Sequence, residues 1–535
     1  MRHAFALAPT GFRPKAWQEL SMRETGFRSR LGLEIGAVLA SFFVSAWSVW
    51  SDDIINNDGI LYLRCAREFS AGNWEAAFAV YGWPWYSYLI SIGTSVLGLS
   101  GESAAHLLDA VCNALMVFAF ISIAKWASED RRVHLLAAFF IVAFPEFNED
   151  RSSLLRDHGF LAFYLLSIRA FLSFESGGRW SSAALWGAFM LVAALFRIEG
   201  FALWAMVPFV VLFDRRRGFW KRMGRFAVAH SVLLLLSVAG AAVWLVYAES
   251  RAAGVAESSR LFEPFHRLAD LWPSEGSGIE QRLDVLKTSL LNQYTESYAP
   301  VILVVASLTI VGLESVRTAT IPIFLLLLVV IRSRPAIGVP GPRVWAGLVL
   351  ANVTVLVVFV IDTLFLTERS ALPLALLMLL AAPWGVVSVW GWIQSSKWAP
   401  RAKKWVQVAT CIGLAVWAIE GLVSFGPTKD HIKNCGHWIS ENLGADVKVY
   451  SNSELLLYYA GRDAGPWDGA KSWEWTKKVL RTAVPRGYEY VAVRVRRKRA
   501  DLEADVRRAY PYEPLRVFEG NRGGKVFVYR CPAKR

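Results

Sequence analysis

Residues 31–50 read LGLEIGAVLASFFVSAWSVW, and this stretch decides how the rest of the chain is interpreted. A helix needs roughly 20 apolar residues to cross the hydrocarbon core of a bilayer, and the stretch has that length. Further blocks of similar length lie at Ala104–Trp126, Phe226–Tyr247, Val344–Ile361 and Ala371–Trp392. The pattern predicts a chain that crosses a membrane many times.

The composition supports the same interpretation. The chain has 535 residues, of which 55% are hydrophobic and 19% charged, and its mean hydropathy is +0.35. A soluble chain of this length would not need so many apolar residues to fill its cores. Shorter or interrupted blocks lie at 133–147, 159–174, 181–196, 201–213, 301–313 and 321–331. We therefore expect roughly 11–13 membrane helices, with the number between residues 300 and 343 left open.

The placement of the positive charge predicts the topology. The net charge is +14, but much of it lies in short loops, so the sequence does not favour a nucleic-acid partner. Short loops rich in Lys and Arg stay in the cytoplasm. The N-terminus is then cytoplasmic, and Leu31–Trp50 crosses outward as an uncleaved anchor. The basic loops contain Arg28 and Arg30, Arg131 and Arg132, residues 214–225, residues 332–343 and residues 397–404.

The same rule assigns residues 51–102 to one long external segment. Pro84–Leu99 is apolar, but if it crossed the membrane, Arg131 and Arg132 would face outward. We expect residues 84–99 to form a helix in the outer interface. Its aromatic anchors would be Trp83, Trp85, Tyr86 and Tyr88.

Charged residues are concentrated in the predicted external segments. Loop charges often only cap helices and meet water, and this interpretation stays open for Glu149, Asp150 and Glu368. It suits Arg197 and Glu199 less well, because a charge inside an apolar run costs on the order of 3 kcal/mol unless it lines a polar cavity. The full set is Asp52, Asp53, Asp58, Glu146, Glu149, Asp150, Arg151, Arg156, Asp157, His158, Arg197, Glu199, Glu368 and Arg369.

A chemistry that uses such a set is the transfer of a group from a lipid phosphate at the outer leaflet. A carboxylate at the interface accepts the proton of an attacking hydroxyl or amine. Arginines hold the phosphate through paired hydrogen bonds and stabilise the charge that develops on it. Transporters also bury Asp and Arg, so the residues alone leave both classes open.

The order of motifs resembles that of the GT-C glycosyltransferases, among them protein O-mannosyltransferases and the bacterial aminoarabinose transferases that modify lipid A. The likeness begins with the external Asp, Tyr, Arg-Glu and Gly-Asn-Trp of residues 58–74 and continues nearly to the end of the chain. The matching segments are Asp58–Tyr62, Arg67-Glu68, Gly72–Trp74, Trp83–Tyr88, Arg156-Asp157, Phe196–Gly200, Glu368–Pro373, Trp438–Leu443, Val447–Tyr450 and Leu457–Gly461.

The resemblance implies roles for particular residues. Asp58 would be the catalytic base, and Asp157 would position the acceptor or the base. The phosphate of a polyprenyl-phosphate sugar donor would be held by Arg197, Arg369 and Arg156. Four residues would support the site: Tyr62, Glu199, His158 and Glu368.

No obligatory metal or other cofactor is predicted. Relatives commonly have Asp-Glu at the first acidic motif, whereas here Asp58 is followed by Gly59. No cluster of His, Cys and Asp with ligand spacing is present, although some related enzymes use a divalent cation. The chain also lacks a Gly-rich phosphate loop or nucleotide-sugar fingerprint, which fits a donor carried on a lipid.

The sequence changes character after residue 426, and residues 427–535 read as a small soluble α/β domain. Helical patterns at 429–443 and 473–483 alternate with strand-like runs at 447–450, 490–495 and 526–529. Counting crossings from the last basic loop places this domain in the periplasm. The basic run Arg494–Arg499 is either a solvated face or a contact for anionic headgroups or an acidic glycan.

Two cysteines of this domain bear on its compartment. Cys435 lies in a predicted helix and Cys531 follows the last predicted strand. They are either ordinary buried small residues or a disulfide, and a disulfide would require an oxidising compartment.

The hydropathy pattern and the resemblance together predict a multi-pass glycosyltransferase, with residues 1–426 as its membrane domain, and the resemblance implies that the membrane is the bacterial inner membrane. It would transfer a sugar from a polyprenyl-phosphate donor to a lipid, glycan or protein acceptor at the outer face, in contact with membrane lipids. Two alternatives stay open. One is an oligosaccharide ligase or polymerase that uses lipid diphosphate glycans, and the other is a lipid or sugar transporter. Transporters often show repeated halves, which this sequence does not.

Overall fold

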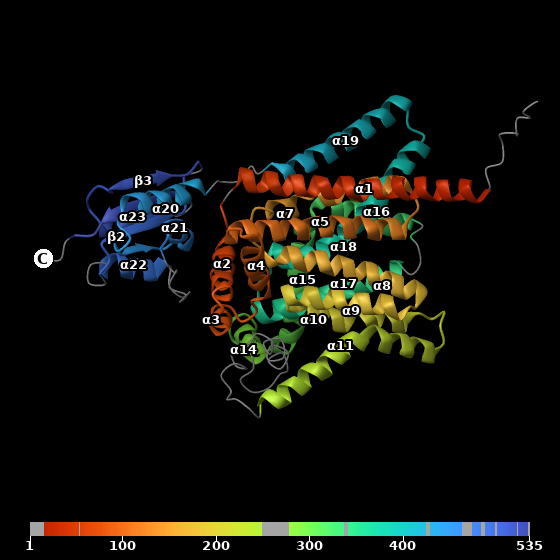
Figure 1. The fold of residues 1–535 in the computed structure, drawn as a ribbon, viewed down its shortest axis with the longest axis horizontal. Helices are drawn as coiled ribbons and strands as arrows, with labels where there is room; N and C mark the ends of the chain where they lie inside the picture. The colour runs from red at the N-terminus through yellow and green to blue at the C-terminus, as the bar shows by residue number, and fades with distance from the viewer. Residues whose placement is uncertain are drawn as a thin grey trace, which may run out of the picture.

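A long bundle of helices carries a small α/β unit at one end (Figure 1). The computed structural model describes residues 15–52, 54–248, 278–335, 337, 341–423, 429–462, 473–482, 487–497, 500–521 and 523–532. The predicted fold class, a polytopic helical bundle with a small C-terminal α/β unit, is confirmed. Most of the predicted external loop 249–299 lies outside the described residues.

The first part of the bundle contains long helices and several short ones near the α/β unit. Its helices are α1 (Lys15–Ser51), α2 (Asn57–Ser70), α3 (Trp74–Val80), α4 (Trp85–Leu97), α5 (Gly101–Ala127), α6 (Arg131–Ala143), α7 (Pro145–Glu149), α8 (Arg156–Gly177), α9 (Trp180–Phe196), α10 (Glu199–Met206), η1 (Val207–Phe213) and α11 (Phe219–Ala248). The second part contains α14 (Gly278–Ser289), η2 (Glu296–Tyr298), α15 (Ala299–Ala319), α16 (Ile321–Ser333), α17 (Gly341–Thr363), α18 (Glu368–Ser395) and α19 (Pro400–Leu422).

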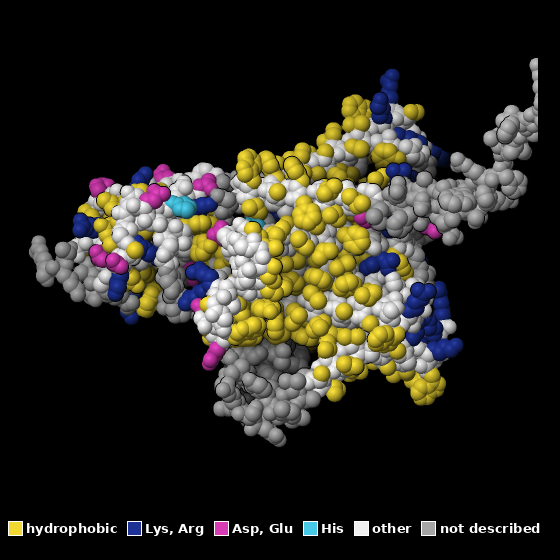
Figure 2. Space-filling model, viewed as in Figure 1, with side chains coloured by type: hydrophobic (Ala, Val, Ile, Leu, Met, Phe, Trp, Pro, Cys, Tyr) yellow, Lys and Arg dark blue, Asp and Glu magenta, His cyan; other side chains and the backbone are white. Residues whose placement is uncertain are grey.

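The bundle has the surface of a membrane protein. Eight of the described helices are long and apolar enough to cross a bilayer, and three shorter apolar helices accompany them. Figure 2 shows hydrophobic side chains over the middle of the bundle, with Lys and Arg gathered at the end farther from the α/β unit. In the most apolar 18-residue stretches of α8 and α18, 72% of the residues are buried. In those of α11 and α19, only 11% are buried. Helices α8 and α18 therefore form the centre, and α11 and α19 face the lipid.

Short helices cover the end of the bundle that lies nearer to the α/β unit. We call this end the site end; it comprises α2, α3, α4, α7 and the first turns of α8 and α18. Helix α4 covers most of residues 84–99, which we expected to be helical, but two of the expected aromatic anchors are not at the surface. Trp83 and Tyr86 are buried, and Trp83 Nε1 donates a hydrogen bond to the Ala194 carbonyl at 3.2 Å. These two aromatic residues pack α4 against the bundle.

Helix α15 lies along the site end, although its length and composition would suit a membrane span. Leu303, near its start, lines a cavity together with Leu364, just after α17. Arg317, near its end, pairs with Glu368 in the first turn of α18 at 2.7 Å. The two positions are about 21 Å apart along a helix, yet both contact the short connection between α17 and α18. The apolar block at 301–313 is therefore not a crossing.

The α/β unit is a four-stranded sheet between helices. Strands β1 (Val449–Ser451), β2 (Tyr490–Val495), β3 (Arg516–Glu519) and β4 (Lys525–Arg530) have the order β1-β2-β4-β3, with β1 and β2 parallel and the other pairs antiparallel. The helices are α20 (Asp430–Asn442), α21 (Glu454–Tyr459), α22 (Trp473–Thr482) and α23 (Ala500–Ala509). Helices α20 and α21 belong to the hydrophobic core that continues into the bundle, and α22 and α23 pack on the other face.

The two cysteines of this unit do not form a disulfide. Both Cys435 and Cys531 are free and buried. Cys435 packs with Val526 and Val528 on one face of the sheet, and Cys531 packs with Phe527 and Tyr529 on the other. Because neighbouring residues of a strand point to opposite faces, the sheet itself separates the two sulfur atoms.

Candidate active site

Five charged side chains at the site end form a continuous series of alternating sign. Arg369 donates from Nη1 to Asp58 Oδ2 and from Nη2 to Asp157 Oδ2, each at 2.8 Å. Arg197 donates to the other oxygen of Asp157 and, from Nη2, to Glu199 Oε1 at 3.0 Å. The series unites residues from α2, α8, the turn after α9, α10 and α18, so it exists only in the folded bundle.

Asp58 lies in the first turn of α2, on a backbone that is closely packed against another loop. The side-chain oxygen of Asn56 accepts a hydrogen bond from the Leu154 backbone N–H at 3.0 Å. A Cβ atom at Gly59 would lie 2.9 Å from Asn56 Oδ1 and 3.1 Å from Leu154 Cβ. A side chain at position 59 would have to displace Asn56 or Leu154, so the packing favours glycine beside Asp58.

Asp157 is the most enclosed acid of the series. Its side chain is 6% exposed, compared with 46% for that of Asp58. Both carboxylate oxygens of Asp157 accept hydrogen bonds from arginines, as a buried charge requires. Asp58 uses only Oδ2 in this way, and its Oδ1 has no partner among the residues that the structure describes. Asp58 is thus the carboxylate that an incoming molecule can reach.

Arg156 lies beside the series without an ion-pair partner. Its guanidinium is 5.6 Å from the centre of the Tyr81 ring, and within the described ranges no carboxylate pairs with it. Tyr62, which is buried, meets Tyr81 and Tyr86 edge to face. Burial raises the pKa of the Tyr62 hydroxyl, with a smaller lowering effect from Arg156, so this group stays protonated.

Two of the predicted supporting residues lie away from the series. His158 is buried and faces Asp109 on α5, with 3.5 Å between His158 Nδ1 and Asp109 Oδ2. Glu368 pairs with Arg317. The structure therefore brings together Asp58, Asp157, Arg197, Glu199 and Arg369, with Arg156 and Tyr62 beside them, but not His158 or Glu368.

Sequence reasoning missed Asp109, which holds the loop before α8. The carboxylate of Asp109 accepts hydrogen bonds from the Tyr86 hydroxyl at 2.9 Å and from the Leu155 backbone N–H at 3.3 Å. Leu155 precedes Arg156 and Asp157, so Asp109 fixes the start of α8. A signal exists in the sequence: Asp109 is an acidic residue inside the apolar block 104–126, and such charges are expensive unless they have partners.

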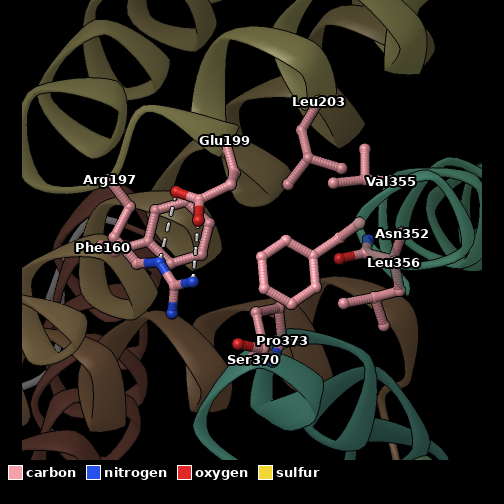
Figure 3. A pocket seen from close by; sticks show the side chains of 10 residues that line it. Phe160, Arg197, Glu199, Leu203, Asn352, Val355, Leu356, Ser370 and Pro373 are labelled. Atoms are coloured by element: carbon pink, nitrogen blue, oxygen red, sulfur yellow. Dashed lines mark hydrogen bonds and ion pairs between the residues drawn. The ribbon is translucent and has the colours of Figure 1, made fainter. Parts of the chain in front are cut away.

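Two cavities flank the charged series. The first is a narrow space of about 30 Å³ between α8, α10, α17 and α18. Figure 3 shows Arg197 and Glu199 on one side of it and Leu203, Val355 and Leu356 on another. This cavity joins the charged series to the apolar interior of the bundle.

The second cavity measures about 190 Å³ and has a different lining. Arg369 forms part of its wall, and four carboxylates surround it: Glu146, Glu149, Asp150 and Glu368. Burial and the neighbouring acids Glu368 and Glu149 raise the pKa of Glu146 to about 7. Burial raises the pKa of Asp150 to about 6. We call this space the acidic cavity.

The arrangement suits chemistry on an anionic group. A half-exposed carboxylate, a buried carboxylate and three arginines lie within one small region. Among the residues that the structure describes, no three Asp, Glu, His or Cys side chains converge closely enough to hold a metal ion. The guanidinium groups of Arg156, Arg197 and Arg369 are charges that could stabilise a developing anion.

Comparison with known proteins gives a match in structure. No family model and no curated sequence matches the chain. ArnT from Cupriavidus metallidurans, solved with bound undecaprenyl phosphate, superposes with a TM-score of 0.51 at 14% identity, over 94% of this chain and 98% of that one. The oligosaccharyltransferase of Archaeoglobus fulgidus, tethered to an acceptor peptide, gives 0.50 at 14% identity, over 94% of this chain and 74% of that one. Both are GT-C glycosyltransferases, and the chain has the GT-C glycosyltransferase fold.

Proposed function

We propose that this protein transfers a glycosyl group from a polyprenyl-phosphate sugar to an acceptor hydroxyl or amine at the outer face of the bacterial inner membrane. The observation that carries the proposal is the bridge formed by Arg369, which ties the half-exposed Asp58 to the buried Asp157. The bridge places a reachable carboxylate directly beside a guanidinium group. A base and an anion-binding group side by side are what the transfer needs.

The reaction follows from the positions of these groups. The acceptor oxygen or nitrogen forms a bond to the anomeric carbon of the sugar and loses its proton to Asp58 Oδ1. The bond between the anomeric carbon and the phosphate oxygen breaks, and its electron pair stays with the lipid phosphate. Asp157 holds Arg369 and Arg197 in place. The guanidinium groups stabilise the additional negative charge on the departing phosphate.

The three arginines differ in their freedom to hold a phosphate. Arg197 donates from all three of its nitrogen atoms to Asp157 and Glu199. Arg369 uses Nη1 and Nη2 for carboxylates, and its buried Nε has no acceptor in the described part of the chain. Arg156 has no carboxylate partner there. We therefore assign the closest phosphate contact to Arg156, with Arg369 second and Arg197 as the group that orients Asp157.

The remaining assignments follow from location. Glu199 neutralises Arg197, and Tyr62 packs beside Arg156 as a neutral hydroxyl. The first part of the donor's lipid chain would lie against Leu203 and Leu356, on the apolar side of the narrow cavity. The basic end of the bundle is assigned to the cytoplasm, which puts the α/β unit in the periplasm.

The proposal is tested with the purified full-length chain in lipid nanodiscs, a polyprenyl-phosphate sugar labelled in the sugar, and envelope extract as the acceptor. Release of polyprenyl phosphate and labelling of the acceptor are followed by mass spectrometry. Asp58→Asn should lower turnover by a factor of about 100 or more without changing the thermal midpoint. Glu75→Gln, an exposed carboxylate of α3, should behave as wild type.

Other outcomes would point elsewhere. Donor binding without turnover would favour a transporter, and turnover only with lipid diphosphate glycans would favour an oligosaccharide ligase or polymerase. Normal turnover in Asp58→Asn would remove Asp58 as the base and leave Asp157 as the candidate.

A further inference from the structure

The acidic cavity lies near the proposed base, Asp58. Its carboxylates favour a positively charged group, whereas the donor phosphate is negatively charged. Its walls come from α7, the end of α15 and the start of α18. Arg369 forms part of the wall and is bonded to Asp58 at 2.8 Å. A molecule in this cavity would therefore lie next to Arg369, the residue that is hydrogen-bonded to Asp58.

The carboxylates around the cavity exceed the cations that could neutralise them. Arg369 is already bonded to Asp58 and Asp157, and Arg317 pairs with Glu368. In the described ranges, no Lys, Arg or His forms an ion pair with Glu146, Glu149 or Asp150. Burial raises the pKa of both Glu146 and Asp150, and the nearby cations Arg317, Arg369 and His158 offset this only in part. A phosphate-bearing donor would be repelled here.

A buried hydroxyl in the wall is an independent observation that favours a ligand site. Thr318, near the end of α15, lines the cavity, and its side chain is fully buried. Its Oγ1 has no hydrogen-bond partner among the residues that the structure describes. Leaving a buried hydroxyl unpaired costs about 1–3 kcal/mol, so such groups usually have a partner. A ligand in the cavity would supply one.

We infer that the acidic cavity binds a positively charged group of the acceptor, an ammonium or guanidinium next to the attacking hydroxyl or amine. The volume of about 190 Å³ equals that of roughly six water molecules, which is enough for such a group. An organic cation also suits the spacing, because the carboxylates do not converge as metal ligands would. The description as an acceptor subsite rests on the proposed function, whereas the preference for a cation does not.

The test measures binding of ethanolamine, which carries an ammonium and a hydroxyl, to the full-length chain in nanodiscs without donor. Saturation-transfer NMR gives the affinity. Ethylene glycol is the neutral isostere, and Mg²⁺ is the metal probe. The variants are the double substitution Glu146→Gln/Asp150→Asn and the single substitution Thr318→Val. The matched control is Glu75→Gln, an exposed carboxylate that lies outside the cavity.

Wild type and Glu75→Gln should bind ethanolamine at least tenfold more tightly than ethylene glycol. The double variant should lose at least tenfold in ethanolamine affinity, and Thr318→Val should lose a smaller factor. Equal ethanolamine binding in wild type and the double variant would overturn the inference, even if glycosyl transfer is intact. The inference would also be overturned if wild type bound Mg²⁺ but not ethanolamine, and if the double variant lost the Mg²⁺ binding. Ethanolamine binding that follows the expected pattern supports the inference even if no transfer is found, in which case the proposed function alone fails.

Discussion

Arg369 donates a hydrogen bond from Nη1 to Asp58 Oδ2 at 2.8 Å, which joins two residues 311 positions apart in the chain. The bond connects the first turn of α18 to the first turn of α2. A second hydrogen bond from the same guanidinium group reaches Asp157. The position of Asp58 therefore depends on a planar group with two parallel donors.

The first prediction concerns this planar group. Arg369→Lys keeps the positive charge but removes the planar guanidinium group with its two Nη donors. A single ammonium group must then pair with both Asp58 and Asp157. We expect turnover to fall by a factor of about 10 or more, and Arg369→Ala to lower it further. Arg132→Lys, an exposed arginine paired with Asp130, is the control for the substitution itself. Wild-type turnover in Arg369→Lys would show that the bridge does not position Asp58.

The second prediction separates a phosphate ligand from a structural arginine. Arg156→Ala breaks no ion pair within the described ranges, so it should weaken donor affinity by a factor of about 10 or more while changing the thermal midpoint little. Arg197→Ala leaves the buried Asp157 short of a partner, which costs about 3–5 kcal/mol when a buried pair is broken. Donor titration and thermal unfolding of the two variants check this. Unchanged donor affinity in Arg156→Ala would place the phosphate elsewhere.

The third prediction concerns pH and the acidic cavity. The pKa of Glu146 is about 7 in the fold and about 4.3 in an unfolded chain. Ionised Glu146 therefore destabilises the fold, progressively as pH rises from about 4.3 to 7 and fully above that range. Glu146→Gln should be more stable than wild type at pH 8, by on the order of 1 kcal/mol, and equal to it at pH 4. Thermal midpoints in nanodiscs measure the difference. An equal gain at both pH values would contradict the electrostatic cause, and Glu75→Gln should show no gain at either.

The fourth prediction concerns orientation. Cys435 and Cys531 are buried and unsuitable for labelling, so exposed positions are needed. Glu75→Cys, at the site end, should react with an impermeant thiol reagent once the outer membrane is permeable. Lys404→Cys, near the start of α19 at the opposite end, should react only after the inner membrane is broken. The reverse pattern would invert the assigned topology.

The sequence was sufficient for the class of fold because blocks of about 20 apolar residues are rare outside membrane-spanning helices. It also identified Asp58, Asp157, Arg197, Glu199 and Arg369, which the bundle brings together. The sequence could not show which of two adjacent residues on a helix faces the charged series. Successive helical residues point about 100° apart, so when Asp157 faces the series, His158 faces Asp109, and when Arg369 faces it, Glu368 turns to Arg317.

Other features depend on tertiary packing that no local pattern contains. Helix α15 has the length and apolarity of a membrane span, and only its contacts with the connection between α17 and α18 show that it lies along the site end. Asn352 donates to the Tyr164 hydroxyl at 2.7 Å deep in the bundle, and like Asp109 it lies inside an apolar block. Polar residues within such blocks are the sequence signal for contacts of this kind, but they do not reveal which partner each residue meets.

The α/β unit also contacts the segment that leads to Asp58. The Ile55 backbone N–H donates to the Tyr459 hydroxyl at 3.1 Å across 404 positions of sequence, and Tyr458 donates to Glu102. At a synthesis rate of about 5–20 residues per second, Tyr459 leaves the ribosome roughly 20–80 s after Ile55. A nascent chain thus makes most of its membrane helices while the segment before Asp58 still lacks this contact, and the contact forms only after Tyr459 has been synthesised.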